Sequence, residues 1–293
     1  MQPEYRSIIE VTGREPVGAV LTIGEKGPSG APTNTDRFFV KEPQETRTGD
    51  KRLRHNHPAF AAYNAADPKY RTVIGGNLVH GTRDEAFTYY LRAQMPPKGS
   101  KWPTHPGGKP FCTGDGQHAT RLYAIGTDGA EDYRHIPCPA DKCEFRLGDL
   151  KLCKPFARLY FRPRWPEGSK LPAPLTKLVT QSWYSVSNIL GIFEYVESQA
   201  NGLGLPSYSP FGLPFTLTLT RKTTAARQRA FPVLTATVDC DLIAFLLAQR
   251  EQIRQLGGEL RALPASALTP DEVAPEVIEA DVADIQPGFG GVA

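Results

Sequence analysis

The sequence predicts a strand-rich α+β fold with two main helices, and three observations support this prediction. The chain has 293 residues, which is long enough for one large domain or two modest ones with a hydrophobic core. It contains 27 glycines and 27 prolines, a combination that favours turns and short strands over a helical bundle. Most of its patterned segments have the character of strands, and only two longer segments follow the period of a helix.

The N-terminal part of the chain is expected to form strands around one short helix. The expected strands are VGAVLTIG, DRFFVKEP, RTVIGGNLVHG and AFTYYLRAQM. Pro58 favours a helix start and precedes the short apolar run AFAAYNAA. The segment PPKGSKWPTHPGGKP, rich in Pro and Gly, then marks the entry to a separate subdomain.

The C-terminal part is expected to form a strand, a long helix, a hairpin and a final helix. FARLYFRPRW is the strand, and a helix from Thr176 to Ala200 follows, ended by NGLG. Its apolar stripe is Val179, Trp183, Val186, Leu190, Phe193, Val196 and Ala200. PFTLTLTRKT and RAFPVLTATV form a hairpin around the loop TAARQ. Asp239 or Asp241 caps the final helix, which ends at Gly257.

These segments suggest a β-rich body, interrupted by an insertion and followed by a tail. The body comprises residues 1–110 and 155–263, the insertion 111–154 and the tail 264–293. The body could be an OB-like barrel. From Ala262 onward there are six acidic residues and no Lys or Arg, so the rest of the chain holds all 34 basic residues against 25 acidic ones. A disordered acidic tail behind a basic body suits a protein that works near nucleic acid, although it could also serve solubility alone.

Four of the five cysteines lie in the insertion and predict a structural zinc site. Cys112, Cys138, Cys143 and Cys153 are separated by 25, four and nine residues. No stretch resembles a membrane span or a secretory signal, so a cytoplasmic location is expected, where thiols stay reduced and cluster to bind metal. Four thiolates complete a closed tetrahedron around Zn²⁺, which leaves no open position for catalysis. His118 or His135 could replace one cysteine, and Cys240 is expected in the core.

No catalytic motif is present in the sequence, so an enzyme is not predicted. GxSxG, P-loop, HExxH and GxGxxG patterns are all missing. HNHP could donate metal ligands, but a turn before Pro58 explains it better. Asp115 and His118 in TGDGQH could form a hydrolytic centre, although a loop is the simpler interpretation. Nothing assembles a nucleophile, a base and an orienting group.

Two basic segments are candidates for binding a partner or a nucleic acid. In FARLYFRPRW, one face of the expected strand carries Arg158, Tyr160 and Arg162. The hairpin adds Arg221, Lys222, Arg227 and Arg229. Aromatic rings combined with guanidinium groups bind single-stranded nucleic acid in oligonucleotide-binding barrels. The alternative is that Phe161 and Trp165 belong to the core while the arginines only solvate its rim.

Several segments also resemble a known family. CEFRLGDLKLCKPFARLYFRPRW, LPAPLTKLVTQSWYSVSNILGIFEYV and GLPFTLTLTRKT are similar to phage and prophage recombination directionality factors, the partners of large serine integrases, whose relatives are often labelled only as metal-binding. TDRFFV, HPAF, LRAQ and GDG add to the likeness, which extends from about residue 15 to residue 264.

The resemblance implies a non-enzymatic accessory protein, encoded by a phage or mobile element, that binds a serine integrase on DNA. Such a factor permits excision between hybrid attachment sites and disfavours integration. It also implies that the four cysteines are the family's metal ligands, while no individual contact residue carries over. A zinc-containing single-stranded DNA-binding protein is the alternative, and a genome neighbourhood with primase and polymerase genes would favour it.

Overall fold

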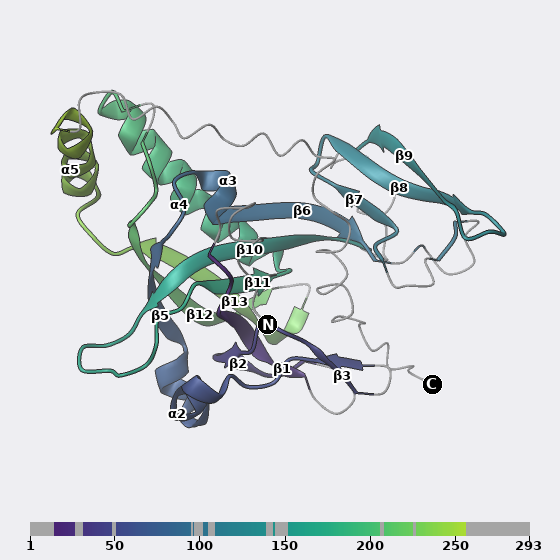
Figure 1. Ribbon diagram of the computed structural model, residues 1–293, viewed down its shortest axis with the longest axis horizontal. Coiled ribbons are helices and arrows are strands. Elements are labelled where there is room, and N and C mark those ends of the chain that lie inside the picture. Colours follow the sequence, from purple (N-terminus) through teal and green to yellow (C-terminus); the bar gives the residue numbers. More distant parts are fainter. Residues whose placement is uncertain are drawn as a thin grey trace, which may run out of the picture.

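The computed structural model describes residues 15–26, 32–48, 51–94, 96, 102–104, 109–138, 143, 152–205, 208–224 and 227–255 (Figure 1). The strands are β1 (Ala19–Lys26), β2 (Pro32–Lys41), β3 (Thr46–Thr48), β4 (Lys51–Leu53), β5 (Val73–Leu78), β6 (Phe87–Ala93), β7 (Cys112–Gly114), β8 (His118–Ile125), β9 (Glu131–Pro137), β10 (Cys153–Arg164), β11 (Thr176–Thr180), β12 (Pro214–Thr224) and β13 (Arg227–Val238). The helices are α2 (Ala61–Ala65), α3 (Arg83–Ala86), α4 (Trp183–Gly202) and α5 (Leu242–Gln255), with 3-10 turns η1 (Pro58–Phe60) and η2 (Pro68–Arg71). The α+β prediction is therefore confirmed.

The long strand β10 is the point from which the sheet branches. One edge of β10 pairs with β11, while the other pairs first with β6 and then with β5. Strands β5 and β6 thus behave as one strand interrupted by residues 79–86, which leave the sheet and include α3. On the edges that face away from β10, β5 pairs with β12 and β6 pairs with β7. The interruption therefore divides one side of the sheet into two wings.

The two wings differ in composition and carry different candidate sites. The first consists of β5, β12 and β13. The second, called the cysteine wing below, consists of β7, β8 and β9 and extends away from the body along β6 (Figure 1). On the far side of β10, β11 pairs in parallel with β1, which pairs with β2. The four-cysteine segment thus continues the main sheet through the β6–β7 ladder.

The sheet has eleven strands and stays open in the described part of the chain. The closed OB-like barrel considered from the sequence is not found in this ladder. Strand β2 does contact β12 and β13, but none of the strand pairs joins them. The sheet therefore curves around its core and leaves a seam between β2 and β12.

Helix α4 covers the core of the body. Its buried residues include Val186, Ile189 and Phe193, which pack with sheet residues such as Phe161 and Leu217. The helix ends at Gly202, and Leu205 N–H donates to the carbonyl of Ala200 as the chain turns away. Phe161 is fully buried and Trp165 packs against the same core, as the rim-solvation alternative expected.

The start of α4 corrects the sequence prediction. Thr176 to Thr180 form β11 instead of the first turns of the helix, and Val179 lies in that strand. The segment alternates buried and half-buried residues and pairs with β1 and β10, so its β-branched residues fit a sheet better than a helix. Ser182 then caps the helix by accepting a hydrogen bond from Ser185 N–H.

The hairpin and the final helix are found where they were predicted, but Thr224, Arg227 and Gln228 of the expected loop TAARQ belong to the two strands. Strands β12 and β13 pair from Phe215 and Val238 to Thr224 and Arg227, and Asp241 accepts a hydrogen bond from Ala244 N–H at the start of α5. Gly257, the predicted end of this helix, lies outside the described residues. Cys240 is exposed between β13 and α5, so its expected place in the core was wrong. In the described part, no helix is long and apolar enough to cross a membrane.

Candidate functional site

The four cysteines of the sequence prediction line one small cavity. Cys112, Cys138, Cys143 and Cys153 surround a space of about 10 Å³, together with apolar residues such as Leu91 and Ile136. A cavity of this size matches about one water-sized sphere. Cys112, Cys138 and Cys153 are buried, Cys143 is half-buried, and all four are free thiols. The fold therefore brings all four cysteines to the lining of one small cavity.

The sheet register positions two of these cysteines on either side of a small residue. Ala93 at the end of β6 lies opposite Cys153 of β10 on one side and opposite Cys112 of β7 on the other. Residues paired in this way project toward the same face of the sheet. The methyl group of Ala93 leaves space between the two sulfur atoms that a larger side chain would fill.

Cys138 reaches the cavity from the end of β9. Its N–H donates to the carbonyl of Gln117 at 2.7 Å, which fixes the turn into the cavity. Gly114 of β7 faces this cysteine, and a Cβ atom added at Gly114 would lie 3.1 Å from Cys138 Sγ. It would also lie 2.6 Å from the carbonyl oxygen of His118. The close approach of the strands around Cys138 thus requires glycine at position 114.

Burial favours the protonated form of two of these thiols, Cys112 and Cys138. It raises the pKa of Cys112, although a hydrogen bond and the charge of Arg121 act in the opposite direction. Burial likewise raises the pKa of Cys138, against a hydrogen bond from the backbone of Gly116. Arg121 is itself buried, close to the rings of Trp102 and Phe111, and supplies one positive charge beside the sulfur atoms. A divalent metal would complete the deprotonation, since a coordinating thiol loses its proton.

The chemistry of the cavity fits a structural metal ion, but its geometry is not that of a formed metal site. In the described ranges, no group of three or more His, Cys, Asp or Glu side chains stands close enough together to hold a metal. The donor set of four thiols is nevertheless the set that closed zinc sites use. Neither His118 nor His135 lines the cavity, and both are exposed. The zinc prediction thus remains a proposal, with the four cysteines as its donors.

The other polar motifs of the sequence have structural roles. His57 Nδ1 accepts a hydrogen bond from Ala59 N–H and so caps η1, as the turn interpretation predicted. Asp115 accepts hydrogen bonds from Gln117 and His118 N–H, both at 2.7 Å, which close a turn and hold the pKa of its carboxyl below the ordinary value. Asp239 bonds to Arg164 and Thr216 instead of capping α5. Each of these three side chains is therefore engaged in a cap, a turn or an ion pair.

The candidate residues of β10 share one face of the strand, and each already has a contact. The Arg158 guanidinium lies 5.2 Å from the ring centroid of Phe156, and Tyr160 packs edge-on against His80. Arg162 donates to the carbonyl of Ala173 and pairs with Glu15. Only Arg162 of the three is exposed. This face is basic, but it presents no open aromatic platform.

The basic candidate residues of the hairpin face different parts of the molecule. Arg221 and Lys222 are neighbours on β12 and both are exposed. Lys222 Nζ lies 5.7 Å from the ring centroid of Tyr184, at the start of α4, whereas the charge of Arg221 acts on Asp36 of β2. The side chains of Arg227 and Arg229 lie outside the described residues. The two described cations of the hairpin therefore serve two different surfaces.

Two arginines that the sequence reasoning missed lie near Arg221. Arg37 of β2 bonds to Asp36, and Arg71 at the end of η2 is 3% exposed and stacks on the ring of Phe39. The alternation of Arg37, Phe39 and Lys41 along β2 was the only sequence signal for Arg37, and no pattern indicated Arg71. The proximity of β2, η2 and β12 depends on the curvature of the sheet, which no local pattern reveals.

The comparisons with known proteins identify the class of the chain. The model of the Gp3-like family, described as recombination directionality factor-like, matches residues 17–239, which include the sheet, the cavity cysteines and α4. The chain therefore belongs to the Gp3-like family of recombination directionality factor-like proteins. Neither a curated protein nor a solved structure matched the chain.

Proposed function

We propose that this protein is a recombination directionality factor that binds a large serine integrase on DNA and switches it from integration to excision. The observation that carries the proposal is the family match over residues 17–239. The protein would act without chemistry of its own, which agrees with polar motifs that serve as caps and turns. Its effect would be to stabilise one arrangement of the integrase over another, because equal affinity for both arrangements would shift nothing.

A factor of this kind needs surfaces of fixed shape, and the branched sheet supports that requirement. Strand β10 spans the molecule from the cavity at Cys153 to the contact of Arg164 with Asp239. The first wing pairs with β10 through its own strand β5, and the cysteine wing pairs with β6, which pairs with β10, so the relative placement of the wings depends on this one strand. The exposed cations of the hairpin, Arg221 and Lys222, are the proposed contacts with integrase or adjacent DNA.

The zinc ion belongs to this proposal as a structural element. Bound zinc would cross-link β7, β9 and β10 through Cys112, Cys138 and Cys153, with Cys143 as the fourth ligand. The raised thiol pKa values and the nearby Arg121 support neutral thiols without the metal and thiolates with it. The ion would hold the wing in place and would take no part in a reaction, since four protein ligands leave no open coordination position.

The alternative is a zinc-containing protein that binds single-stranded DNA. Its supporting observation is the basic face of β10. Stacking of bases needs exposed rings, however, and Tyr160 is half-buried against His80. The directionality role is therefore the better-supported function.

In vitro recombination tests the proposal directly. The integrase encoded beside this gene is assayed on hybrid attachment sites and on the integration pair, with and without this protein. Excision that requires the protein, together with reduced integration, is the expected result. An integrase that is active on the integration pair but unaffected by the protein would refute the directionality role. Tight, salt-sensitive binding to single-stranded oligonucleotides would then favour the alternative.

A further inference from the structure

The outer edge of β13 is covered by α4 over part of its length only. Leu234 N–H donates to Ser185 Oγ at 3.1 Å, and the Leu234 carbonyl accepts from Asn188 Nδ2 at 2.9 Å. Both backbone polar groups of Leu234 therefore point away from β12 and are satisfied by α4. Pro232, two residues earlier, has no N–H to offer at this edge. Side chains of α4 and a proline thus protect the edge up to Leu234.

Beyond Leu234 the same edge stays open in the described part of the chain. Backbone groups of successive residues in an antiparallel ladder point to opposite edges of the strand. Asp239 N–H donates to the carbonyl of Pro214 in β12, which fixes this alternation at the end of β13. Ala236 and Val238 are in step with Leu234, so their N–H and carbonyl groups point outward. None of the described residues forms a hydrogen bond with them on that side, which leaves two donors and two acceptors available.

A groove of about 520 Å³, called the β13 groove below, lies along this open stretch. It is lined by the end of β13 and by the sides of α4 and α5 that face it, through Ala236, Val238, Gly191, Tyr195, Leu242 and Ile243. Tyr195 is 52% exposed and Ile243 is 39% exposed, so the rim presents apolar surface to solvent. A Cβ atom added at Gly191 would meet nothing within 4 Å, whereas Asn188, one turn earlier, reaches the strand. The groove is thus open where α4 has no side chain to cover the edge.

An open strand edge inside a partly apolar groove fits an extended peptide segment. Such a segment joins the sheet by pairing its own N–H and carbonyl groups with those of the edge strand, while its side chains alternate between groove and solvent. Proteins usually protect open edges with lysine, proline or a bulge. The stretch from Thr235 to Val238 has neither Lys nor Pro, and its register with β12 is regular. This part of β13 is therefore suited to receive a further strand.

The charge of the β13 groove distinguishes between candidate segments. Among the described residues that line it, Asp241 carries a negative charge and none is a Lys or Arg. Asp241 accepts a hydrogen bond from Ala244 N–H, so its carboxylate is held at the end of the groove. The tail of this chain has six acidic residues and no Lys or Arg from Ala262 onward, so it is repelled, whereas a segment with basic residues is attracted. A protein that holds DNA is rich in such residues.

We propose that the β13 groove binds an extended, basic segment of the integrase as an additional strand beside Ala236 and Val238. The inference rests on the proposed function, which supplies the partner. A Lys or Arg of the segment would lie near Asp241, and its apolar side chains would pack between Gly191 and Ile243. The cations of the hairpin lie at the other end of β12 and β13, so this contact is separate from them.

Residue-resolved hydrogen exchange tests the mode of binding. It is measured on the full-length protein, free and bound to the integrase encoded beside its gene. In the free protein the amides of Ala236 and Val238 should exchange faster than those of Thr235 and Thr237, which the ladder with β12 protects. In the complex the two outward amides should slow by about tenfold or more. A stable complex without this slowing would overturn the proposal. Protection of both amides in the free protein would show that another part of the chain fills the groove, and would overturn it as well.

Two substitutions block the groove without removing a contact of the free protein. Ala236→Pro removes an outward N–H that β12 does not use, and Pro232 already occupies such an outward position in the same strand. Its matched control is Ala236→Ser, which keeps the N–H. Gly191→Leu fills the groove from α4 and should keep or raise the Tm, because leucine favours a helix over glycine. Its matched control is Gly202→Leu, since Gly202 also meets nothing within 4 Å and lies outside the groove.

The affinity of these variants for the integrase is then compared with that of the wild type. Both blocking variants should bind about five- to tenfold more weakly, because a strand contact at the centre of the interface is lost. The two controls should bind like the wild type. Gly191→Leu keeps the test informative even if Ala236→Pro does not fold. Wild-type affinity in a folded Gly191→Leu protein would overturn the proposal.

The same assays test the charge of the segment and separate this inference from the proposed function. Asp241→Asn keeps a cap for α5, because asparagine caps a helix as well as aspartate does, and should weaken integrase binding about threefold at low salt. Tighter binding of this variant would contradict a basic segment. Excision is scored separately. A protein that drives excision while its blocking variants bind and act like the wild type would refute only this inference. Protection of Ala236 and Val238 by an integrase whose recombination is unaffected would refute only the directionality role.

Discussion

The side-chain amide of Asn64 pairs with both backbone polar groups of Val40. Asn64 Oδ1 accepts from Val40 N–H at 2.9 Å, and Asn64 Nδ2 donates to the Val40 carbonyl at 2.8 Å. Strand β2 pairs with β1 along one edge. On the opposite edge, the side-chain amide of Asn64 in α2 takes the place that a further strand would occupy at Val40. An open sheet needs such covers, because a free edge can pair with another chain.

Asn64→Ala should therefore destabilise the protein. It leaves the N–H of the buried Val40 without its partner, which costs about 1–3 kcal/mol when water cannot replace it, whereas the Val40 carbonyl keeps the hydrogen bond that His57 N–H donates. Urea unfolding measures the effect. Asn201→Ala is the control, because Asn201 is exposed at the end of α4. Equal midpoints for the two variants would show that the edge is covered in another way.

The strand periods and the hairpin could be predicted from the sequence because their information is local. The residues at which helices and strands begin and end depend on the strands with which they pair, and these partners are not visible in a local sequence pattern. Thr176 to Thr180 continues the apolar stripe of α4 in sequence, and only pairing with β1 and β10 makes it a strand. The clustering of the cysteines was signalled by their spacing, whereas the placement of Cys112 and Cys153 on either side of Ala93 was not. The burial of Arg71 depends on Phe39 of a distant strand and gave no sequence signal.

A pair of glycine substitutions should have opposite effects. Gly114→Ala introduces a Cβ atom 2.6 Å from a backbone oxygen and 2.8 Å from Ala119 Cβ, so the cysteine wing must shift and lose stability. Gly191→Ala on α4 meets nothing within 4 Å and should stabilise the protein by about 0.5–1 kcal/mol, because alanine favours the helix. Thermal unfolding distinguishes them. An unchanged Tm in Gly114→Ala would indicate that the strands around the cavity are less closely packed than in the structure.

The ion pair of Glu25 with Lys41 should make stability depend on acid pH. Burial acts to raise the pKa of Glu25, but the hydrogen bond and charge of Lys41 dominate and leave it below the ordinary value of 4.5. A lowered folded-state pKa means that the carboxylate contributes stability above the unfolded-state pKa. This contribution is lost as the pH falls through the folded value. The wild type should therefore be more stable than Glu25→Gln at neutral pH.

Unfolding free energies of these two proteins between pH 7 and pH 3 provide the measurement. The neutral-pH difference should be about 1–3 kcal/mol, because Lys41 is buried and would lose the negative charge of Glu25 while keeping neutral partners such as Asn56. The difference should shrink at the acid end, where the wild-type carboxyl also becomes neutral. A difference that stays constant with pH would assign the loss to packing instead of charge.

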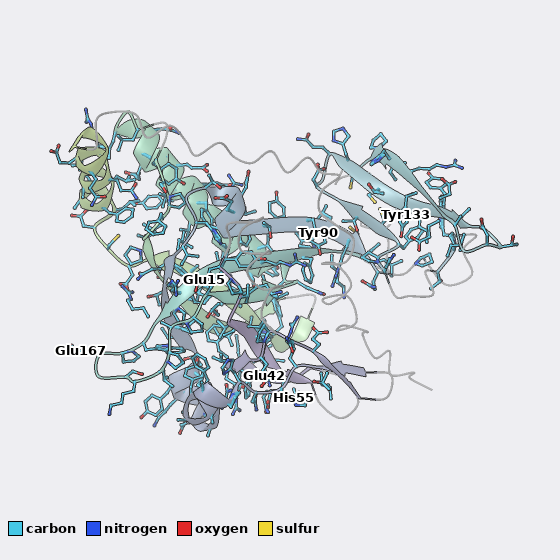
Figure 2. The ribbon with its side chains drawn as sticks, viewed as in Figure 1. Glu15, Glu42, His55, Tyr90, Tyr133 and Glu167 are labelled. Carbon is cyan, nitrogen blue, oxygen red and sulfur yellow. The ribbon has the colours of Figure 1, made fainter. Side chains whose placement is uncertain are left out.

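Metal removal should loosen the cysteine wing while the body stays folded. The proposed zinc would join β7, β9 and β10, whereas the body has its own core around α4 (Tyr133 marks β9 in Figure 2). Metal analysis should find about one zinc per chain. Hydrogen exchange after chelation should accelerate in β7 to β9 more than in β12. Cys112→Ser should behave like the chelated protein, and Cys240→Ser should behave like the wild type, because Cys240 lies exposed and outside the cavity. Full zinc occupancy in Cys112→Ser would exclude this ligand set.

Substitutions in the two groups of basic candidates should have different effects, on stability for β10 and on partner binding for the hairpin. On β10, the combined variant Arg158→Ala, Tyr160→Ala and Arg162→Ala should lower the Tm, because it removes the interactions with Phe156, His80 and Glu15. On the hairpin, replacing Arg221, Lys222, Arg227 and Arg229 by alanine should leave the Tm nearly unchanged, since the two described side chains are exposed. Excision should fall with this second variant, because the cations that face the proposed partner are gone. If the hairpin variant unfolds, these cations support the fold, and the partner must be sought on another surface.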